Sequence, residues 1–318
     1  MLARGLAANG HHVTLFAHVD STWPGHLVPW PGKSSGSRHD TLLNAAKLAS
    51  VVAKERFDVV HSFSRMAYLA PILPFSLPKI MSYQREINPR SVIWANALSR
   101  GSLRFTAISR WMMQHVENCG RWSLIPNGVP LSRYTFRREV AQEAPFVFLG
   151  RIEEIKGPHL AIEIARRANR RLVIAGNIPS EKRSWVEKNV LRYVDGKLVQ
   201  FVGPVDDLQK NIILSEASAL LMPILWEEPF GIVMAEAMAC GTPVLGLRRG
   251  AVPEVVVDGI TGFVADSIDG LVHAAGRLGS LDRLACRARV EALYSDVAII
   301  AAFEQLYMES LTVHQNAS

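Results

Sequence analysis

The sequence predicts an α/β protein with parallel sheets, organised as two domains. Strand-like runs alternate with helix-like runs along the 318-residue chain, which is typical of successive βα units. The alternation weakens across the polar, charged residues 130–145 and resumes strongly at the apolar run 146–149. We therefore expect an N-terminal domain at residues 1–133 and a C-terminal domain at residues 134–318.

In the first half, helix signals and strand signals follow each other in order. Asn9-Gly10 ends the first expected helix, and Ser109 is placed to cap a later one. The expected helices are 2–8, 41–54 and 110–118. The expected strands are 13–17, 58–62, 79–83 and 104–108, with a further strand at 123–129 that ends in a turn.

The second half repeats the pattern with stronger apolar runs. The expected strands are 146–150, 171–176, 199–203, 219–223, 243–246 and 262–264. The expected helices are 159–169, 209–215, 232–240 and a terminal amphipathic helix at 299–311. Ligands of such sheets bind beyond the carboxyl ends of the strands, which is where the loops below are expected.

Composition excludes several classes of protein. Hydrophobic residues make up 49% of the chain and charged residues 20%, as in globular rather than disordered proteins. The chain has no apolar run of about 18 residues and no signal-peptide core. The three cysteines are far apart, which predicts neither a metal site nor a disulfide framework and favours the cytoplasm. The net charge of +6 comes with no nucleic-acid motif.

Residues 226–243 carry the most informative pattern. Glu228 and Glu236 have seven residues between them, and Gly231 permits a tight turn into the helix expected at 232–240. The first N–H groups of a helix lack intrahelical partners and favour an anion such as a diphosphate. The two carboxylates can accept hydrogen bonds from hydroxyl groups. The pattern thus indicates a nucleotide-sugar site, although two solvated acids on an ordinary helix are the alternative.

A second loop carries the opposite charge. Arg151 and Lys156 follow the strand 146–150, at its carboxyl end. Arginine binds a phosphate through forked donors and lysine through a point charge. Both can therefore stabilise a departing nucleoside diphosphate, and the alternative is a solvated basic loop.

Together these motifs resemble those of the retaining family-four glycosyltransferases of the GT-B fold. The resemblance is dense from Phe146 to Val264, covers the turn 126–129 and extends loosely to 58–61. It rests on the following residues: 150–151, 156–157, 172–176, 202–203, 228–231, 236–237, 239–244, 250, 253–255, 258–259 and 261–262.

The resemblance implies two Rossmann-like domains that face each other across a cleft, with a C-terminal helix that crosses back to the N-domain. Arg151 and Lys156 would bind the donor diphosphate, Glu236 the ribose and Glu228 the sugar. Transfer would retain the anomeric configuration without a metal ion or a cofactor. Backbone N–H groups of the following residues would meet phosphate or sugar oxygens: Phe230, Gly231, Ile232 and Val233.

The chain departs from the family pattern at two places. The family commonly has His-x-His at the end of an N-domain strand, whereas this chain has His61 and then Phe63 in the second position. His61 is a candidate substitute, local pairing at the strand end is the alternative, and Arg65 is a further candidate contact. Second, the chain begins inside the family's first helix. The first strand and its glycine-rich loop are therefore expected to be absent, which would expose two strand edges.

A glycosyltransferase is the leading hypothesis. A sugar-nucleotide-binding protein without turnover and a GT-B nucleotide-sugar epimerase are the alternatives, whereas a dinucleotide dehydrogenase would need a GxGxxG fingerprint that the chain lacks. The acceptor is expected to be a glycan, a lipid-linked sugar or a small molecule. The basic charge is compatible with peripheral contact at the inner face of the membrane.

Overall fold

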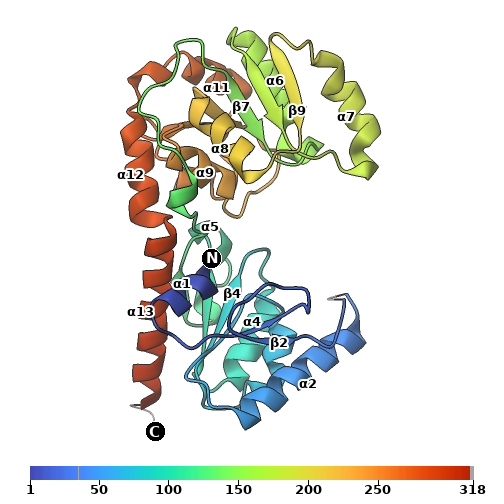
Figure 1. The fold of residues 1–318 in the computed structure, drawn as a ribbon, viewed down its shortest axis with the longest axis vertical. Coiled ribbons are helices and arrows are strands. Elements are labelled where there is room, and N and C mark those ends of the chain that lie inside the picture. The colour runs from blue at the N-terminus through green and yellow to red at the C-terminus, as the bar shows by residue number, and fades with distance from the viewer. Residues whose placement is uncertain (35, 316–318) are drawn as a thin grey trace. The chain divides into compact units, whose positions relative to one another are not determined.

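A computed structural model describes residues 1–34 and 36–315 of the chain (Figure 1). The chain divides into two compact units, of which one comprises Met1–Pro126 and Ile299–Ser318 and the other Asn127–Ala298. The division thus lies after Pro126 rather than after residue 133. The reason is local, because the N–H of Val129 donates to the carbonyl of Tyr294 at 2.8 Å within the second unit.

The first unit has parallel strands with short helices between them. The strands β3 (Val60–Ser62), β4 (Lys79–Tyr83), β5 (Leu103–Ala107) and β6 (Trp122–Leu124) form one sheet in chain order. The strands β1 (Thr14–Ala17) and β2 (His26–Pro29) form a separate pair. The helices are α1 (Leu2–Ala8), α2 (Arg38–Lys54), α3 (Met66–Leu69), α4 (Pro89–Leu98) and α5 (Arg110–Met113).

The two sheets of the first unit do not join within residues 1–34 and 36–126. In that part of the chain β1 pairs only with β2, and β3 pairs only with β4. Each therefore has one edge whose backbone N–H and C=O groups face no neighbouring strand.

The second unit is built on a six-stranded parallel sheet in the order β12-β11-β10-β7-β8-β9. Its strands are β7 (Phe146–Leu149), β8 (Leu172–Ala175), β9 (Val199–Gly203), β10 (Ala219–Met222), β11 (Val244–Leu247) and β12 (Gly262–Ala265). Strand order reverses between β7 and β10, which lie side by side. The carboxyl ends of these two strands therefore form the switch point at which α/β sheets bind ligands.

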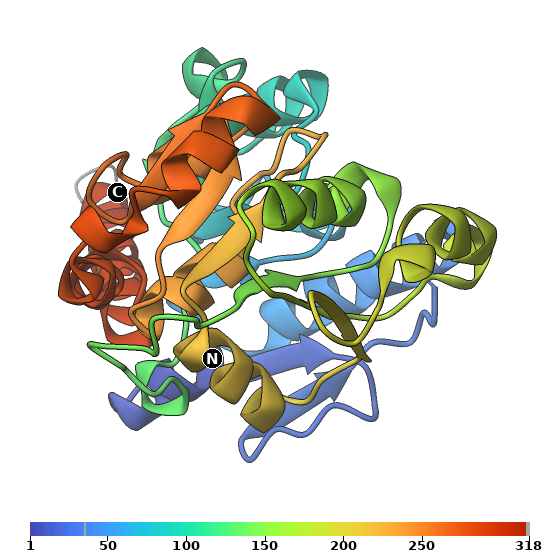
Figure 2. The same cartoon turned by 90° about the horizontal axis from the view of Figure 1, so that it is seen from above.

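Helices cover both faces of this sheet (Figure 2). Contacts join α6 (Pro158–Arg167) to α11 (Ile268–Ala275) and α9 (Ile232–Ala239) to α12 (Arg283–Leu293). The core between helices and sheet contains Phe146, Ile174, Leu221 and Leu245, each buried. The helices are α6 (Pro158–Arg167), α7 (Arg183–Asn189), α8 (Asp207–Glu216), α9 (Ile232–Ala239), α10 (Val252–Val255), α11 (Ile268–Ala275) and α12 (Arg283–Leu293).

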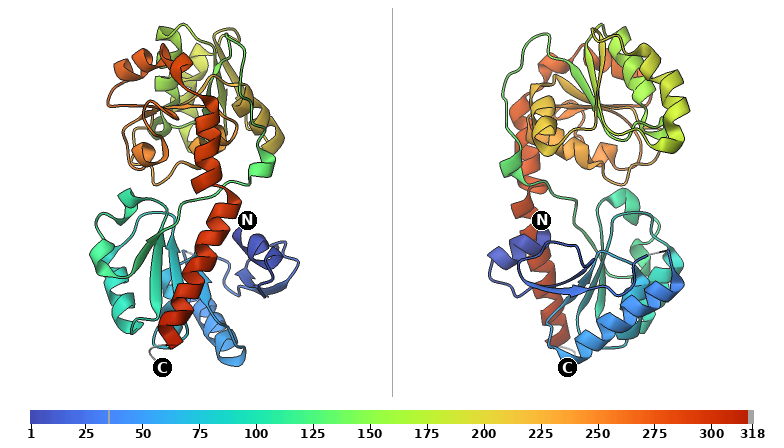
Figure 3. Two further views of the ribbon diagram at one scale, coloured as in Figure 1. Left: turned by 90° about the vertical axis from the view of Figure 1, so that its left-hand side faces the viewer. Right: turned by 45° about the vertical axis from the view of Figure 1, so that its right-hand side comes forward.

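The last helix, α13 (Asp296–Gln315), belongs to the first unit from Ile299 onward. Phe303 and Leu306 pack against Ile80 and Ile125 of that unit, and Figure 3 shows the helix running beside its strands. The expected return of the C-terminal helix to the N-domain is therefore confirmed. Among the described residues, no helix combines the length and apolar character that spanning a bilayer requires.

Candidate functional site

The loop after β7 is held against the end of β10. Gly157 has φ of +76° and begins α6. A Cβ atom at this position would overlap the carbonyl of Pro223, so only glycine permits the approach. The N–H of Leu225 donates to the carbonyl of Ile155 at 2.8 Å, which joins the two loops a second time.

This approach brings Lys156 and Glu228 together as the sequence predicts for a common site. Lys156 Nζ lies 2.9 Å from Glu228 Oε2, and the side chains are 18% and 10% exposed. The indole Nε1 of Trp226 donates to the same oxygen at 3.1 Å, and the Lys156 ammonium lies 4.3 Å from the centre of the Trp226 ring. Glu228 is thus a nearly buried carboxylate held by a cation and an N–H donor.

Arg151 lies on the same loop but has a different partner. Its guanidinium forms a 2.7 Å ion pair with Glu153, which is buried, while the Arg151 side chain stays 57% exposed. Arg151 is thus paired with a buried carboxylate, while more than half of its own side chain stays accessible to a ligand.

The loop that carries Glu228 is fixed from the other side by the segment after β11. Gly250 has φ of +54°, and a Cβ atom there would meet the backbone of Glu228. The N–H of Gly250 donates to the Glu227 carboxylate, and the N–H of Ala251 donates to the Glu228 carbonyl at 2.8 Å. Three loops of the sheet's carboxyl edge therefore position one carboxylate.

The N-terminus of α9 follows directly. Gly231 occupies the N-cap position with φ of +73°, and no side chain caps the helix. The N–H of Met234 donates to the carbonyl of Gly231 at 2.9 Å, so Ile232 and Val233 are the residues at the helix start whose N–H groups can face an anion. Phe230 is buried against Tyr294, with 5.4 Å between ring centres, so only its backbone can meet a ligand. Ile232 is exposed and Val233 half-buried at the start of the helix.

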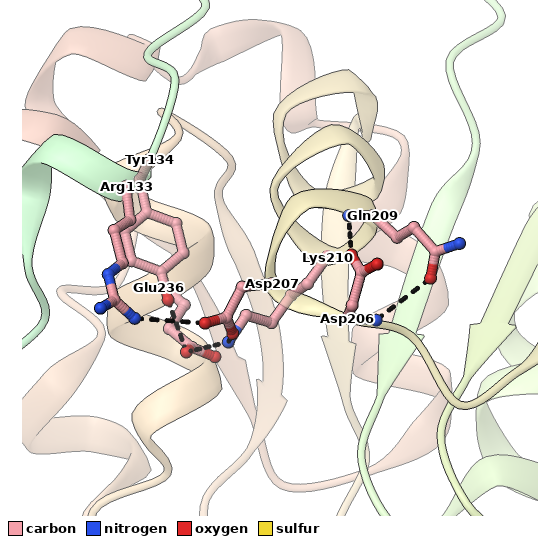
Figure 4. A network of polar contacts seen from close by, with 7 residues as sticks. All are labelled: Arg133, Tyr134, Asp206, Asp207, Gln209, Lys210 and Glu236. Carbon is pink, nitrogen blue, oxygen red and sulfur yellow. Dashed lines mark hydrogen bonds and ion pairs between the residues drawn. The ribbon is translucent and has the colours of Figure 1, made fainter. Parts of the chain in front are cut away.

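Glu236 lies one turn into α9 and belongs to a second polar cluster (Figure 4). Its Oε1 accepts hydrogen bonds from the Tyr134 hydroxyl at 2.6 Å and from Lys210 Nζ at 2.8 Å. Burial, together with the hydrogen bond and charge of Glu236, raises the pKa of Tyr134, which therefore keeps its proton. Burial lowers the pKa of Lys210, but Glu236 and Asp207 outweigh it and raise the pKa overall.

His61 lies in the first unit at the end of β3. Its Nδ1 is 2.7 Å from the Tyr307 hydroxyl on α13, and its Nε2 is 2.6 Å from Ser82 Oγ on β4. Desolvation by burial lowers the pKa of His61 to about 3, so the ring is neutral at physiological pH. The structure thus shows the local pairing at the strand end that the sequence left open. Arg65 hydrogen-bonds Thr41.

The sequence missed three residues of these clusters, namely Trp226, Tyr134 and Lys210. Trp226 adjoins the motif and could have been included. Tyr134 and Lys210 are 102 and 26 residues away from Glu236, and no spacing rule links them to it. Among the described residues, no group of three or more side chains is arranged to bind a metal ion.

Two family models match the chain. The model described as "Glycosyltransferase Family 4" matches residues 1–133, and that described as "Glycosyl transferases group 1" matches residues 136–275. Glycogen synthase of Mycobacterium tuberculosis is 31% identical over 201 residues, which are 58% of this chain and 48% of that protein. The chain thus spans about half the length of this relative.

Solved structures share the fold over nearly the whole chain. Sucrose-phosphate synthase of Thermosynechococcus elongatus superposes with a TM-score of 0.77 at 21% identity, over 98% of this chain and 92% of that one. Anabaena HepE, in a structure with UDP and glucose, has a TM-score of 0.69 at 17% identity and covers 89% of this chain and 86% of its own. At these sequence identities, both comparisons show a shared fold alone.

Proposed function

Because the chain belongs to the family-four glycosyltransferases and has their GT-B fold, we propose that it transfers a sugar from a nucleoside-diphosphate-sugar donor to an acceptor. The observation that supports this proposal most is the Lys156–Glu228 pair at the switch point of the second unit's sheet, beside an uncapped helix N-terminus. A cation, N–H groups and a carboxylate are the groups that a diphosphate and a sugar require.

In the proposed reaction, Lys156, Arg151 and the N–H groups at the start of α9 bind the diphosphate. Their positive charge stabilises the negative charge that builds up on the leaving phosphate as the glycosidic bond breaks. Glu228 accepts a hydrogen bond from a sugar hydroxyl, and Glu236 from a ribose hydroxyl. Before the donor binds, the Glu228 carboxylate neutralises the Lys156 ammonium. The donor phosphate then replaces Glu228 as the partner of this ammonium, which already lies at the site.

We further propose that transfer retains the anomeric configuration, with the acceptor attacking from the face that the phosphate leaves. The phosphate then serves as the base. In this proposal Glu228 acts as a positioning and electrostatic group, and Trp226 continues to donate to its Oε2 when Lys156 turns to the phosphate. NMR of the anomeric proton of the first-formed product measures the outcome, and an inverted product would overturn this part of the proposal.

We propose that no divalent cation and no cofactor is required, because Arg151, Lys156 and the α9 N-terminus supply the positive charge. Transfer rates in excess EDTA are expected to equal those in Mg²⁺. A rate that falls with EDTA and recovers with the metal would contradict this.

The test of function is a screen of UDP-, GDP- and ADP-sugars for binding, donor hydrolysis and transfer. Lys156→Ala and Glu228→Ala are each expected to reduce transfer by more than about tenfold, while both variants remain folded by circular dichroism. Wild-type rates in both variants would refute the site. Nucleotide binding with neither hydrolysis nor transfer would indicate a binding protein, and an isomerised donor without an acceptor would indicate an epimerase.

We also propose that the chain works in the cytoplasm at the inner face of the membrane, on a glycan, a lipid-linked acceptor or a small molecule. The supporting feature is the outer face of α4, where Ile93, Trp94 and Leu98 are 54%, 50% and 39% exposed between the exposed Arg90 and Arg100. Apolar residues flanked by arginines suit an anionic lipid surface. Trp94→Glu is expected to abolish sedimentation with phosphatidylserine vesicles, and unchanged sedimentation would refute this contact.

A further inference from the structure

The two oxygens of the Glu236 carboxylate have different surroundings. Oε1 accepts hydrogen bonds from two donors, the hydroxyl of Tyr134 and the ammonium of Lys210 (Figure 4). Within the described residues, Oε2 accepts no hydrogen bond. This oxygen is also not fully shielded from solvent. The side chain as a whole is only 12% exposed. One oxygen is therefore held by the protein while the other remains open to a ligand.

The two donors are themselves fixed. Lys210 also pairs with Asp207 at 3.1 Å, and it lies on the first turn of α8, which the Asp206 capping box stabilises. Its ammonium therefore cannot swing away from Glu236 without leaving two carboxylates.

The backbone at Tyr134 and at the residue after it is anchored by hydrogen bonds. The next residue, Thr135, exchanges two hydrogen bonds with Asn211 of α8, at 2.8 and 3.0 Å. The carbonyl of Tyr134 accepts a hydrogen bond from Arg287 at 3.2 Å, and the same guanidinium nitrogen donates to the carbonyl of Ala239 at the end of α9 at 2.9 Å. The hydroxyl therefore approaches Glu236 from a backbone anchored to the helices around it.

From this arrangement we infer that Tyr134 and Lys210 are positioning residues that select the ribose of the donor. They fix the rotation of the Glu236 carboxylate so that Oε2 faces the ligand hydroxyl. A carboxylate held in this way favours a ribose hydroxyl over a hydrogen atom at the same position, because an unmatched buried acceptor is costly. The inference rests on the proposed role of Glu236 in donor binding.

The test is calorimetric titration with UDP, 2′-deoxy-UDP and 3′-deoxy-UDP, and with the same three forms of GDP. The wild-type protein is expected to bind one ribonucleotide roughly tenfold or more tightly than one of its deoxy forms, the effect of a hydrogen bond to a charged group. In Tyr134→Phe and Lys210→Met, this ratio is expected to fall to about threefold or less, with the affinity for the deoxy form little changed.

Matched variants separate positioning from general damage. Arg133→Ala removes the exposed 3.2 Å pair with Asp207 in the same segment without touching Glu236, so its ratio is expected to equal that of the wild type. Lys210→Arg is expected to restore part of the ratio. In a Glu236→Ala background, which removes the acceptor, Tyr134→Phe is expected to change nothing further.

Two results would overturn the inference while leaving the proposed function intact. One is an unchanged ratio in a folded Tyr134→Phe protein, which tests the idea even where Lys210→Met does not fold. The other is an equal loss of affinity for the ribonucleotides and the deoxynucleotides. Absence of binding by the wild-type protein to either nucleotide series would instead refute the donor site, and the inference with it.

Discussion

Replacing Lys156 by methionine leaves the Glu228 carboxylate nearly buried without its cation. Removing one member of a buried ion pair typically costs 3–5 kcal/mol, because the remaining charge is desolvated. Here the side chains are 18% and 10% exposed, and Trp226 still donates to the same oxygen. We therefore expect a cost near the lower limit, about 3 kcal/mol. For a unit of this size that lowers Tm by about 6–12 °C.

Differential scanning calorimetry of four proteins measures this effect: the wild type, Lys156→Met, Glu228→Gln and the double variant. Glu228→Gln is expected to lower Tm less than Lys156→Met does. It leaves the Lys156 ammonium unpaired, which is more exposed than the Glu228 carboxylate, and the glutamine amide oxygen still accepts hydrogen bonds. The double variant is expected to be more stable than Lys156→Met alone, because it no longer contains an unpaired carboxylate. Equal shifts in both single variants, or a Lys156→Met shift below about 1 °C, would refute the buried-pair argument.

Three further predictions concern other parts of the structure. Burial lowers the pKa of His61 from 6.5 in the unfolded chain to about 3 in the folded protein. Below pH 6.5 the unfolded chain therefore binds a proton that the folded protein does not. As the pH decreases further, the unfolding free energy should decrease by up to about 1.4 kcal/mol per pH unit. Urea unfolding at pH 7 and pH 5 should show this loss, and His61→Gln should reduce it. Gly157→Ala should cost at least about 2 kcal/mol through its positive φ and the Pro223 carbonyl, whereas Gly196→Ala, strained in open space, should cost about half as much; equal losses would contradict the close approach. Glu228→Gln should bind free UDP or GDP more tightly than the wild type while transferring sugar more slowly, and weaker nucleotide binding would contradict the proposed neutralisation of the nearby ammonium.

The strands of the second unit could be predicted closely, because each is a short apolar run and glycine marks the turns. Its helices were predicted less completely, since α7, α10, α11 and α12 were not expected. All six expected strands are present, and Gly231 begins α9 as predicted. The first unit was harder. The helix expected at 110–118 ends at Met113, and β2 was not predicted at all. His26–Pro29 is a four-residue strand with one pairing partner, so its sequence carries little periodic signal.

Some residues of the candidate site could likewise be predicted from the sequence, and others could not. The residues on the loops after β7 and β10 were predictable, because parallel strands bring their carboxyl ends to one edge of the sheet. The pairing of Lys156 with Glu228 follows from that rule once β7 and β10 are neighbours. The donors to Glu236 come from outside the motif, and only the folded chain brings them together. The same holds for the contact between His61 and Tyr307, which are 246 residues apart.

The assignment of Ile299 onward to the first unit has a consequence for the order in which the chain folds during synthesis. The second unit is one continuous segment and is complete once residue 298 has left the ribosome. The first unit emerges earlier but lacks Phe303 and Leu306, which belong to its core, until synthesis has passed residue 306. At 5–20 residues per second, its strands wait roughly 10–40 s for that helix. During this interval Ile80 and Ile125 remain uncovered, so we expect the first unit to be the part of the nascent chain that depends most on chaperones.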